Sequence, residues 1–411
     1  MKKSLFSYSF VLCILILFTC TVLIAQSWLP VKRLTWNDGG SWAPQIAVDA
    51  SHTLHMVWFD NNPGNEEIFH KRSTNNGMTW SKATRLTWES QISYNPWIAA
   101  DSLGNIYVVW MNLDPVLSRG DLFFKKSTDS GTTWSPPSRL TWTGLYYDPG
   151  LTVDDDDNIH VVFCGYFNDF YYKKSTDGGG SWSPRTRLTW GLLGCILPDI
   201  CTFSNNVIHV AWSANWDNKD IYYKRSTDGG ATWSLIKRIT WNPDTSRYAK
   251  IAADGNSNVF ITWTYYSSAG LEIYYVKSTD QGVSWGNLQR FTWNNSFPSS
   301  NSTIGIDSSN NVHIIWNNSF AFFHRWSTNA GSTWSQREEV PDVFSYVSTA
   351  NMVIDPTDTI HFVWQNNPAG NFDIYYTHRD DVYSTAASTG VSQSPEPNGR
   401  TIRDRTNKEK K

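Results

Sequence analysis

The sequence STDGGATW at residues 226–233 indicates a repeated architecture, because five close copies of it occur elsewhere in the chain. Two further phrases recur with it: RLTW, as at residues 187–190, and an apolar run ending in tryptophan, such as IHVAW at residues 208–212. The three phrases contain 18 of the 23 tryptophans, six in each. Successive copies lie 48 to 54 residues apart, and a fixed period of this size is typical of a repeat architecture.

Each repeat is predicted to contain four short strands. In the fourth copy these cover residues 198–202, 207–212, 221–226 and 237–240, with turn residues between them and no helical periodicity. One such unit cannot bury both faces of its sheet, so neighbouring copies must stack. Radial closure of four-stranded sheets gives a β-propeller.

The number of first strands predicts seven blades. These strands lie near Ile46, Ile98, Leu151, Ile200, Ile251, Ile304 and Met352. The last copy ends after its third strand at Asp380, whereas residues 28–36 carry an RLTW phrase with no strand before it. We therefore expect an all-β, seven-bladed β-propeller of antiparallel blades, closed by the N-terminal strand in blade seven.

Composition divides the chain into three parts. Residues 1–25 join Lys2 and Lys3 to an apolar stretch, as a secretory signal peptide does; a lipid anchor at Cys20 and an uncleaved membrane anchor are the alternatives. Residues 26–380 form the propeller, and the basic tail 381–411 is expected to be a disordered linker. No later segment has the length and apolarity of a membrane span.

Charge and cysteine content limit the classes of molecule that the propeller is expected to bind. The propeller has a net charge of −7 and no basic stripe, which argues against nucleic acid. Its three cysteines show no metal spacing, and we expect neither metal nor cofactor. Cys201 takes the place of Ala47, Ala99 and Ala252 in sister repeats, as a small core residue would. The sequence leaves open whether Cys164 and Cys195 pair.

The STDGGATW phrase and its copies resemble the Asp-box, or BNR, repeat of sialidases and their non-catalytic relatives, over about residues 30–380. The resemblance is strongest to secreted bacterial repeat proteins of the sialidase-like propeller group. It implies a propeller in which each box forms the turn between the third and fourth strands, remote from the ligand face. The residues at the Asp position are Asn75, Asp129, Asp177, Asp228, Asp280 and Asn329.

Differences between equivalent positions of the repeats favour structural roles, rather than catalysis or metal binding, for several polar residues. Asn75 and Asn329 keep the hydrogen-bond acceptor of the box without its charge, which a turn tolerates and a general acid or calcium ligand does not. Five second strands carry histidine at one position, where Tyr107 and Phe260 stand in two others, so packing is preferred to metal ligation. For the acidic run at 154–157, a solvated turn is preferred to a calcium site.

The candidate ligand-binding residues lie in the loops between strands two and three and between successive blades. These loops share one face and vary among the repeats, as binding loops on a rigid scaffold do. They carry Trp42, Asp60, Tyr94, Asp114, Arg119, Tyr146, Tyr147, Asp148, Tyr166, Trp216, Asp217, Arg247, Tyr265 and Tyr266. Aromatic rings beside carboxylates and arginine suit a sugar, which stacks its CH face and hydrogen-bonds through its hydroxyls.

The expected function is therefore binding of a glycan or a cell-surface protein by a monomeric, non-catalytic propeller, secreted or held in the cell envelope or periplasm. An exo-α-sialidase is the first alternative. Sialidases of the family hold the substrate carboxylate with three arginines and carry an Arg-Ile-Pro phrase near the start. Here residues 31–36 read VKRLTW, and only Arg119 and Arg247 lie in ligand-face loops, so we assign no catalytic residue. A structural module of the cell envelope is the second alternative.

Overall fold

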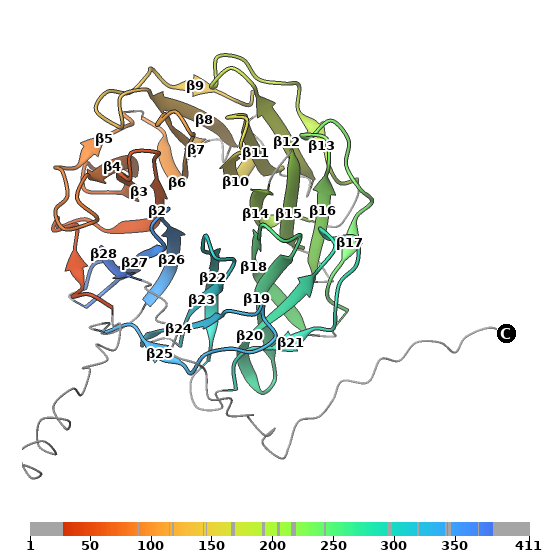
Figure 1. The fold of residues 1–411 in the computed structure, drawn as a ribbon. Helices are drawn as coiled ribbons and strands as arrows, with labels where there is room; N and C mark the ends of the chain where they lie inside the picture. The colour runs from red at the N-terminus through yellow and green to blue at the C-terminus, as the bar shows by residue number, and fades with distance from the viewer. Residues whose placement is uncertain are drawn as a thin grey trace, which may run out of the picture. The chain divides into compact units, whose positions relative to one another are not determined.

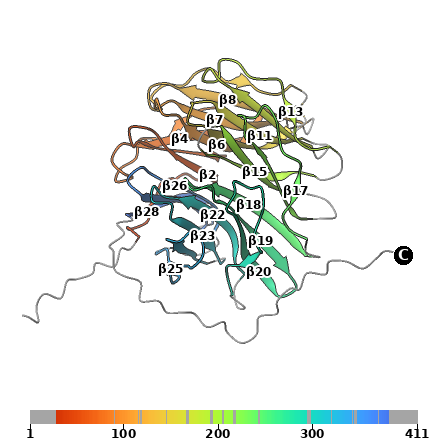
Figure 2. The same cartoon turned by 45° about the vertical axis from the view of Figure 1, so that its right-hand side comes forward.

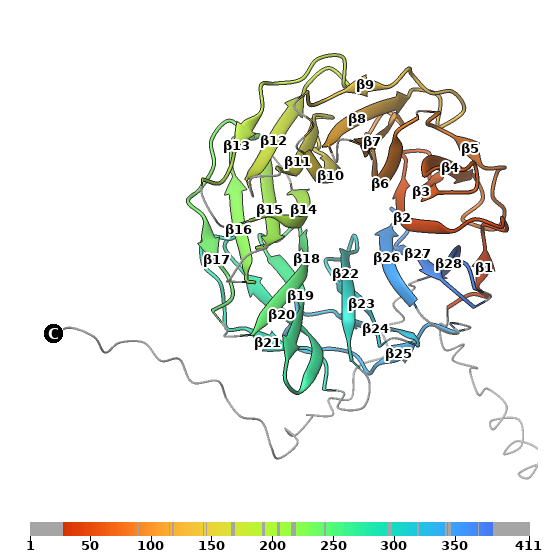
Figure 3. The same cartoon turned by 180° about the vertical axis from the view of Figure 1, so that it is seen from behind.

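The structure is a computed structural model that shows a ring of seven four-stranded antiparallel sheets (Figures 1 and 3). It describes residues 28–380 except 89, 115, 117–118, 143, 145, 166–168, 191–193, 204–205, 215–218, 242–243, 294–297, 319, 342, 344–346 and 369. The predicted signal peptide and tail lie outside these residues. The all-β, seven-bladed fold is confirmed, and no helix in the described part is long and apolar enough to span a bilayer.

The blades follow one another along the chain. Blade one contains β2 (Ser41–Val48), β3 (Leu54–Asp60), β4 (Glu67–Ser73) and β5 (Thr84–Arg85). Blade two contains β6 (Ile92–Ala100), β7 (Ile106–Asp114), β8 (Arg119–Ser127) and β9 (Ser138–Arg139). Blade three contains β10 (Tyr146–Val153), β11 (Ile159–Gly165), β12 (Phe170–Ser175) and β13 (Thr186–Arg187). Blade four contains β14 (Ile196–Phe203), β15 (Val207–Ser213), β16 (Ile221–Ser226) and β17 (Lys237–Arg238).

The remaining blades keep this pattern. Blade five contains β18 (Thr245–Ala253), β19 (Val259–Ser267), β20 (Gly270–Ser278) and β21 (Gln289–Arg290). Blade six contains β22 (Ser300–Ile306), β23 (Val312–Asn317), β24 (Phe322–Ser327) and β25 (Glu338–Glu339). Blade seven contains β26 (Val347–Ile354), β27 (Thr359–Asn366), β28 (Asp373–Asp380) and, as its outermost strand, β1 (Lys32–Arg33).

The N-terminal strand closes the ring, as the sequence predicts. Lys32 of β1 pairs with Tyr376 of β28, and Arg33 pairs with Tyr375. The backbone N–H of Leu34 donates to the carbonyl of Ile374 over 2.7 Å, and Arg33 forms a 2.6 Å ion pair with the buried carboxylate of Asp373. Both ends of the propeller sequence therefore share one sheet.

The core lies between adjacent sheets, which stack side by side around the ring (Figure 2). Between blades three and four, for example, Val162 and Phe170 pack with Ile208 and Trp212 in one buried cluster. The tryptophans of the apolar runs form the deepest part of this core and are at most 3% exposed; they are Trp58, Trp110, Trp212, Trp263, Trp316 and Trp364. Burial of these large rings contributes strongly to the driving force for stacking the blades.

The predicted strands differ from the structure at both ends of a blade. In blade four the first strand starts at Ile196 rather than at residue 198, because it continues through a β-bulge between Ile196 and Asp199. The fourth strand keeps ladder pairing only at Lys237 and Arg238. Beyond it, Ile239 still donates its backbone N–H to Ile221, over 2.8 Å.

The six STDGGATW-like phrases form the turns between the third and fourth strands. In blade four, Asp228 Oδ1 accepts the backbone N–H of Thr232 over 2.8 Å, and Ser226 Oγ accepts the N–H of Gly230, also over 2.8 Å. Gly230 has a φ of 87°, a conformation that glycine adopts without strain. In blade one, Asn75 Oδ1 accepts the N–H of Thr79 over 2.9 Å, so asparagine makes the same backbone contact as aspartate.

Buried histidines connect the second strands to the turns that precede them. His160 Nε2 lies 2.9 Å from Asp154 Oδ2, and His160 Nδ1 lies 2.7 Å from the Tyr172 hydroxyl. Burial is the main cause that lowers the pKa of His160, which favours the neutral imidazole. In the acidic run, Asp157 accepts hydrogen bonds from the Ser102 N–H and hydroxyl, over 2.8 and 2.9 Å.

Candidate functional site at the mouth of the central channel

The innermost strands of the seven blades enclose a central channel (Figure 1). Its cavity has a volume of about 410 Å³. Ile46, Ile98, Ile251 and Ile304 contribute to its apolar wall. A volume of this size lies in the range of small-ligand sites.

Every innermost strand carries a β-bulge near its first residues, at the end of the channel where the variable loops lie. The bulges fall between Trp42 and Gln45, Tyr94 and Trp97, Tyr147 and Gly150, Ile196 and Asp199, Arg247 and Lys250, Ser300 and Thr303, and Val347 and Ala350. A bulge of this kind redirects side chains at a strand end and is frequent beside active sites. We call this end of the channel the mouth.

Six bulges hold a non-glycine residue at positive φ, between 46° and 61°. These residues are Ala43, Asn95, Asp148, Leu197, Tyr248 and Asn301. Asparagine and aspartate tolerate this conformation, but leucine and tyrosine adopt it at a cost of about 1 kcal/mol or more. Ten other described non-glycine residues with positive φ lie outside the bulges, so strain alone does not single out the mouth. Its repetition at the strand ends beside the variable loops makes the mouth the candidate site.

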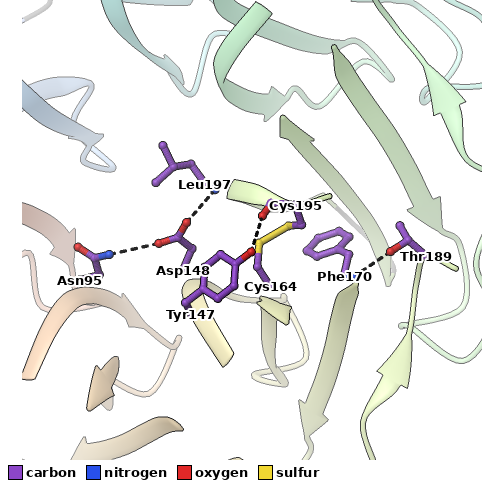
Figure 4. The surroundings of a disulfide bond; sticks show 8 residues. All are labelled: Asn95, Tyr147, Asp148, Cys164, Phe170, Thr189, Cys195 and Leu197. Atoms are coloured by element: carbon purple, nitrogen blue, oxygen red, sulfur yellow. Dashed lines mark hydrogen bonds between the residues drawn. A yellow bond between two sulfur atoms is a disulfide. The ribbon is translucent and has the colours of Figure 1, made fainter. Parts of the chain in front are cut away.

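Hydrogen bonds join three consecutive bulges (Figure 4). Asn95 Nδ2 donates to Asp148 Oδ1 over 3.2 Å, and the Leu197 backbone N–H donates to Asp148 Oδ2, also over 3.2 Å. Burial nevertheless raises the pKa of Asp148 above its ordinary value, and the two hydrogen bonds offset only part of that effect. Asp148 is thus a partly buried acid that links blades two, three and four.

Two tyrosines lie beside this acid. Burial, with the charges of Asp148 and Glu66, raises the pKa of Tyr94 to about 12. Burial and Asp148 likewise raise the pKa of Tyr147 to about 12, so both phenols are neutral hydrogen-bond donors at physiological pH. Burial also raises the pKa of Glu66. Tyr94 therefore lies within the electrostatic reach of two carboxyl groups from different blades.

A disulfide supports the same side of the mouth. Cys164 in β11 is bonded to Cys195, which precedes β14, with 5.5 Å between their Cα atoms (Figure 4). The Tyr147 hydroxyl donates to the Cys195 carbonyl over 3.2 Å. The bond joins blades three and four next to Asp148. Cys201 is a free thiol, and it lies opposite His209 in the strand register of blade four. Ala47 lies opposite His55 in the same way in blade one, so the two residues occupy equivalent positions.

Blade five presents a cationic part of the mouth. Arg247 directly precedes the bulge residue Tyr248, and its Nε is buried without a hydrogen-bond partner. Burial is the main cause that raises the pKa of the neighbouring Tyr266 to about 12, and Tyr248 adds to it. A buried guanidinium N–H without an acceptor is costly, and a ligand carboxylate or hydroxyl would satisfy it.

The residues that directly follow the bulges of β6, β14 and β18 are Trp97, Asp199 and Lys250, and they lie below the mouth. Lys250 Nζ lies 3.6 Å from Asp199 Oδ1 and 5.0 Å from the centre of the Trp97 ring, which comes from blade two. The cation therefore bridges an acid of blade four and an aromatic ring of blade two. These contacts add charged groups to a channel whose lining also includes the polar residues Gln45, Thr152 and Asn351.

The structure brings four predicted ligand-binding residues to one equivalent position. Trp42, Tyr94, Tyr147 and Arg247 each directly precede the bulge of their blade, and Asp148 is itself a bulge residue.

The remaining predicted residues have other surroundings. Asp60 is buried and accepts hydrogen bonds from Ser41 Oγ and Asn37 Nδ2, both over 2.6 Å, which gives it a structural role. Asp114 and Arg119 pair at the end of the β7–β8 hairpin, where Arg119 is exposed. Tyr146, Tyr265 and Tyr266 lie near the mouth, the first two buried. Tyr166, Trp216 and Asp217 lie outside the described residues.

Sequence reasoning missed Asn95, Tyr248 and the electrostatic influence of Glu66 on Tyr94. One signal in the sequence points to the bulge: proline follows Ala43, Asn95, Asp148 and Leu197 at one position of four first strands. Proline restricts the residue before it, so this repeated dipeptide indicates an irregular backbone in an otherwise regular strand.

No protein-family model and no curated protein sequence matches the chain. Solved structures do. An α-L-arabinanase of Penicillium chrysogenum has 14% identity and a TM-score of 0.57, over 86% of this chain and 98% of that one. An ulvan lyase has 12% identity and a TM-score of 0.60, over 84% and 95% of the two chains. A Hadza microbial sialidase has 14% identity and a TM-score of 0.50, over 83% and 66%. At these identities the likeness shows that the chain shares the β-propeller fold with these proteins.

Proposed function

We propose that the chain binds carbohydrate at the channel mouth, as a secreted or envelope-held member of the Asp-box propellers without catalytic activity. The observation that carries the proposal is the ring of bulges, which holds non-glycine residues in strained conformations beside Tyr94, Tyr147 and Arg247. Aromatic rings supply stacking surfaces for a sugar, and the neutral phenols and unpartnered guanidinium N–H supply hydrogen bonds.

Two further observations support this proposal. The structural neighbours named above include an arabinanase, an ulvan lyase and a sialidase, which are carbohydrate-active proteins by name. The Cys164–Cys195 disulfide suits an oxidising compartment, in agreement with the signal peptide expected at residues 1–25.

A glycan array tests the proposal, with the wild type, Tyr94→Ala, Arg247→Ala and the control Leu235→Ala. Leu235 is 92% exposed and lies two residues before the outermost strand β17, whereas the mouth residues lie on the innermost strands. We expect the wild type and the control to bind the same glycans, and each mouth variant to lose about tenfold or more in affinity, as loss of a central contact does. Equal binding by all four proteins, or no glycan bound by the wild type, would reject the proposal.

Glycan cleavage is the second candidate function, favoured by one observation. Asp148 and Glu66 both have a pKa raised by burial, and both act on Tyr94. Acids with raised pKa values serve as proton donors in many glycan-cleaving enzymes. The bound glycan and a fluorogenic sialoside should be incubated with the protein and the products followed by mass spectrometry. Turnover that disappears in Asp148→Asn would establish cleavage, whereas an unchanged glycan supports binding alone.

A further inference from the structure

The three sets of tryptophans differ sharply in exposure. The six that end the RLTW-like phrases are 65–72% exposed, whereas those of the apolar runs are at most 3% exposed. We call the exposed set the rim tryptophans: Trp36, Trp88, Trp142, Trp190, Trp241 and Trp293. Each follows the short outermost strand of its blade. A large apolar side chain left in solvent six times on one molecule is unusual for a protein without a partner at that surface.

Packing of the blades does not account for these rings. In RLTW of blade three, Leu188 is buried and donates its N–H to the Phe170 carbonyl, and Thr189 Oγ1 accepts the Phe170 N–H over 2.9 Å. The buried position varies among the repeats, with isoleucine at 239 and phenylalanine at 291. The exposed tryptophan is kept in six of the seven copies, and only the copy in blade six, which reads Val340-Pro341-Asp342, has another residue there. The position that makes the core contact is thus more variable than the one facing solvent.

A positive charge lies next to each rim tryptophan. Lys71, Lys125, Lys173 and Lys224 lie 5.6, 5.3, 5.5 and 5.9 Å from the ring centres of Trp36, Trp88, Trp142 and Trp190. Arg238 and Arg290 lie 4.3 and 6.0 Å from those of Trp241 and Trp293. Each lysine comes from the next blade around the ring and donates to the carbonyl of the leucine in the adjacent RLTW phrase.

This geometry fixes each ring without covering it. The Lys173 ammonium is buried and bonded to the Leu140 carbonyl over 3.1 Å, so the cation holds the Trp142 ring against the seam between blades two and three. About two thirds of the ring remains open to solvent. A ring held in place in this way loses little further conformational entropy when a ligand binds.

One seam also shows a groove. Between blades two and three, a cavity of about 460 Å³ is lined by Arg139, Trp142, Lys173, Ser181 and Trp182, among others. It combines two indole rings with a hydroxyl and two cations. A cavity of this size is comparable to small-ligand sites, and the outer wall places it on a different surface from the channel mouth.

We propose that the rim tryptophans form six equivalent binding sites, one at each of six seams between blades, for the pyranose units of a polysaccharide. A pyranose ring presents a CH face that stacks on indole, while its hydroxyls meet the serine and the cation beside the ring. The chemistry favours a sugar over a protein, because the rings are separate and each is flanked by charge. A protein partner requires a continuous interface of roughly 1,000 Å² or more. Repetition around the ring suits a polymer that engages several sites together.

A triple variant tests the proposal: Trp88→Ala, Trp142→Ala and Trp190→Ala together, with Leu103→Ala, 77% exposed in the turn between β6 and β7, as the control. The probes are cellulose, chitin and xylan, in sedimentation assays, and the soluble oligosaccharide of whichever polymer binds. We expect the triple variant to lose at least about tenfold in affinity for the polymer, while single variants lose much less. The reason is that several weak sites bound to one polymer chain together give a much higher affinity than any single site. The triple variant should keep the glycan-array binding that Tyr94→Ala and Arg247→Ala lose, so failure here and failure of the mouth proposal can be told apart.

A footprint of the wild type keeps the proposal testable if the triple variant does not fold. N-bromosuccinimide should oxidise the rim tryptophans before the buried ones, and bound polymer should protect them when modified peptides are mapped by mass spectrometry. Rim tryptophans that stay equally reactive with polymer bound would overturn the proposal, as would absence of binding to all three polymers. Binding to vesicles of anionic lipid that the triple variant loses, without polysaccharide binding, would overturn it in favour of a membrane surface.

Discussion

Asn95 donates a hydrogen bond from Nδ2 to Oδ1 of Asp148 over 3.2 Å, and this contact joins the innermost strands of blades two and three. The two residues occupy the same place in their blades, each with a positive φ and each followed by proline. Blades two and three are thus linked at the mouth by their own bulge residues. Because Asp148 also accepts the Leu197 N–H, one carboxyl group spans three blades.

The buried acid predicts how the stability of the protein depends on pH. Burial raises the pKa of Asp148, so the native protein holds this proton more tightly than the unfolded chain does. The associated stability is complete below the unfolded-state pKa and is lost as pH rises through the higher folded-state value. We expect Asp148→Asn to remove this loss, as measured by urea unfolding between about pH 4 and pH 7. Asp155→Asn, at an exposed turn, is the control; the same pH slope in wild type and Asp148→Asn would contradict the prediction.

The strained backbone predicts a stabilising substitution. Leu197 has a φ of 47°, and its backbone N–H, which glycine retains, makes the contact with Asp148. We expect Leu197→Gly to raise the free energy of unfolding by about 1 kcal/mol, because glycine adopts this conformation without a steric penalty. Leu235→Gly, at a position outside the positive-φ set, should be neutral or destabilising. Denaturant unfolding of both variants checks this, and a stability loss in Leu197→Gly would show that the leucine side chain outweighs the strain.

The disulfide is predicted to stabilise the fold. Cys164 and Cys195 are separated by 31 residues, so their bond restricts a long loop of the unfolded chain. Replacing both by alanine should lower the free energy of unfolding by about 3 kcal/mol. Reductant should lower the stability of the wild type and leave that of the double variant unchanged. The single variant Cys201→Ala, at the free thiol, should respond to reductant as the wild type does.

Most of the fold could be predicted from the sequence because it is repeated. The blade number follows from the seven first strands, and the closure follows from the displaced RLTW phrase at residues 33–36. Equivalent positions can be compared between repeats, and such a comparison distinguishes structural residues from catalytic ones. Asn75, for example, stands where other repeats have aspartate and makes the same backbone hydrogen bond.

The site was less predictable, because it depends on backbone conformation and on contacts between blades. Trp42 and Tyr94 were found as aromatic residues in variable loops, but their shared position beside a bulge required the strand register. The approach of Glu66 to Tyr94 depends on two blades meeting in space. Asp60 was misleading, because a carboxylate at the ligand face can equally well accept hydrogen bonds from neighbouring side chains, here those of Ser41 and Asn37.

The turn aspartates predict a pH dependence of opposite sign to that of Asp148. Hydrogen bonds, the largest from the hydroxyls of Thr133, Ser181 and Ser284, lower the pKa of Asp129, Asp177 and Asp280 to about 2. Their stabilisation is present above the unfolded-state value of 3.8 and is lost as pH falls toward 2. A triple Asp→Asn variant, which imitates Asn75 and Asn329, should therefore stay folded at neutral pH and lose less stability in acid. Urea unfolding at neutral pH and at pH about 3 measures this, and an equal acid loss in both proteins would contradict it.

Removal of either of two tryptophans in the closing segment should have very different effects on stability. Trp28 is 4% exposed and packs with Phe322 of blade six and Phe362 of blade seven, whereas Trp36, eight residues later, is 67% exposed. Trp28→Ala should therefore cost about 3 to 5 kcal/mol, the range for a large buried ring, because it opens a cavity where the ring of blades closes. Trp36→Ala should change the free energy of unfolding by no more than about 0.5 kcal/mol. Thermal and urea unfolding of the pair tests closure directly, since equal effects would mean that the N-terminal segment does not hold blades six and seven together.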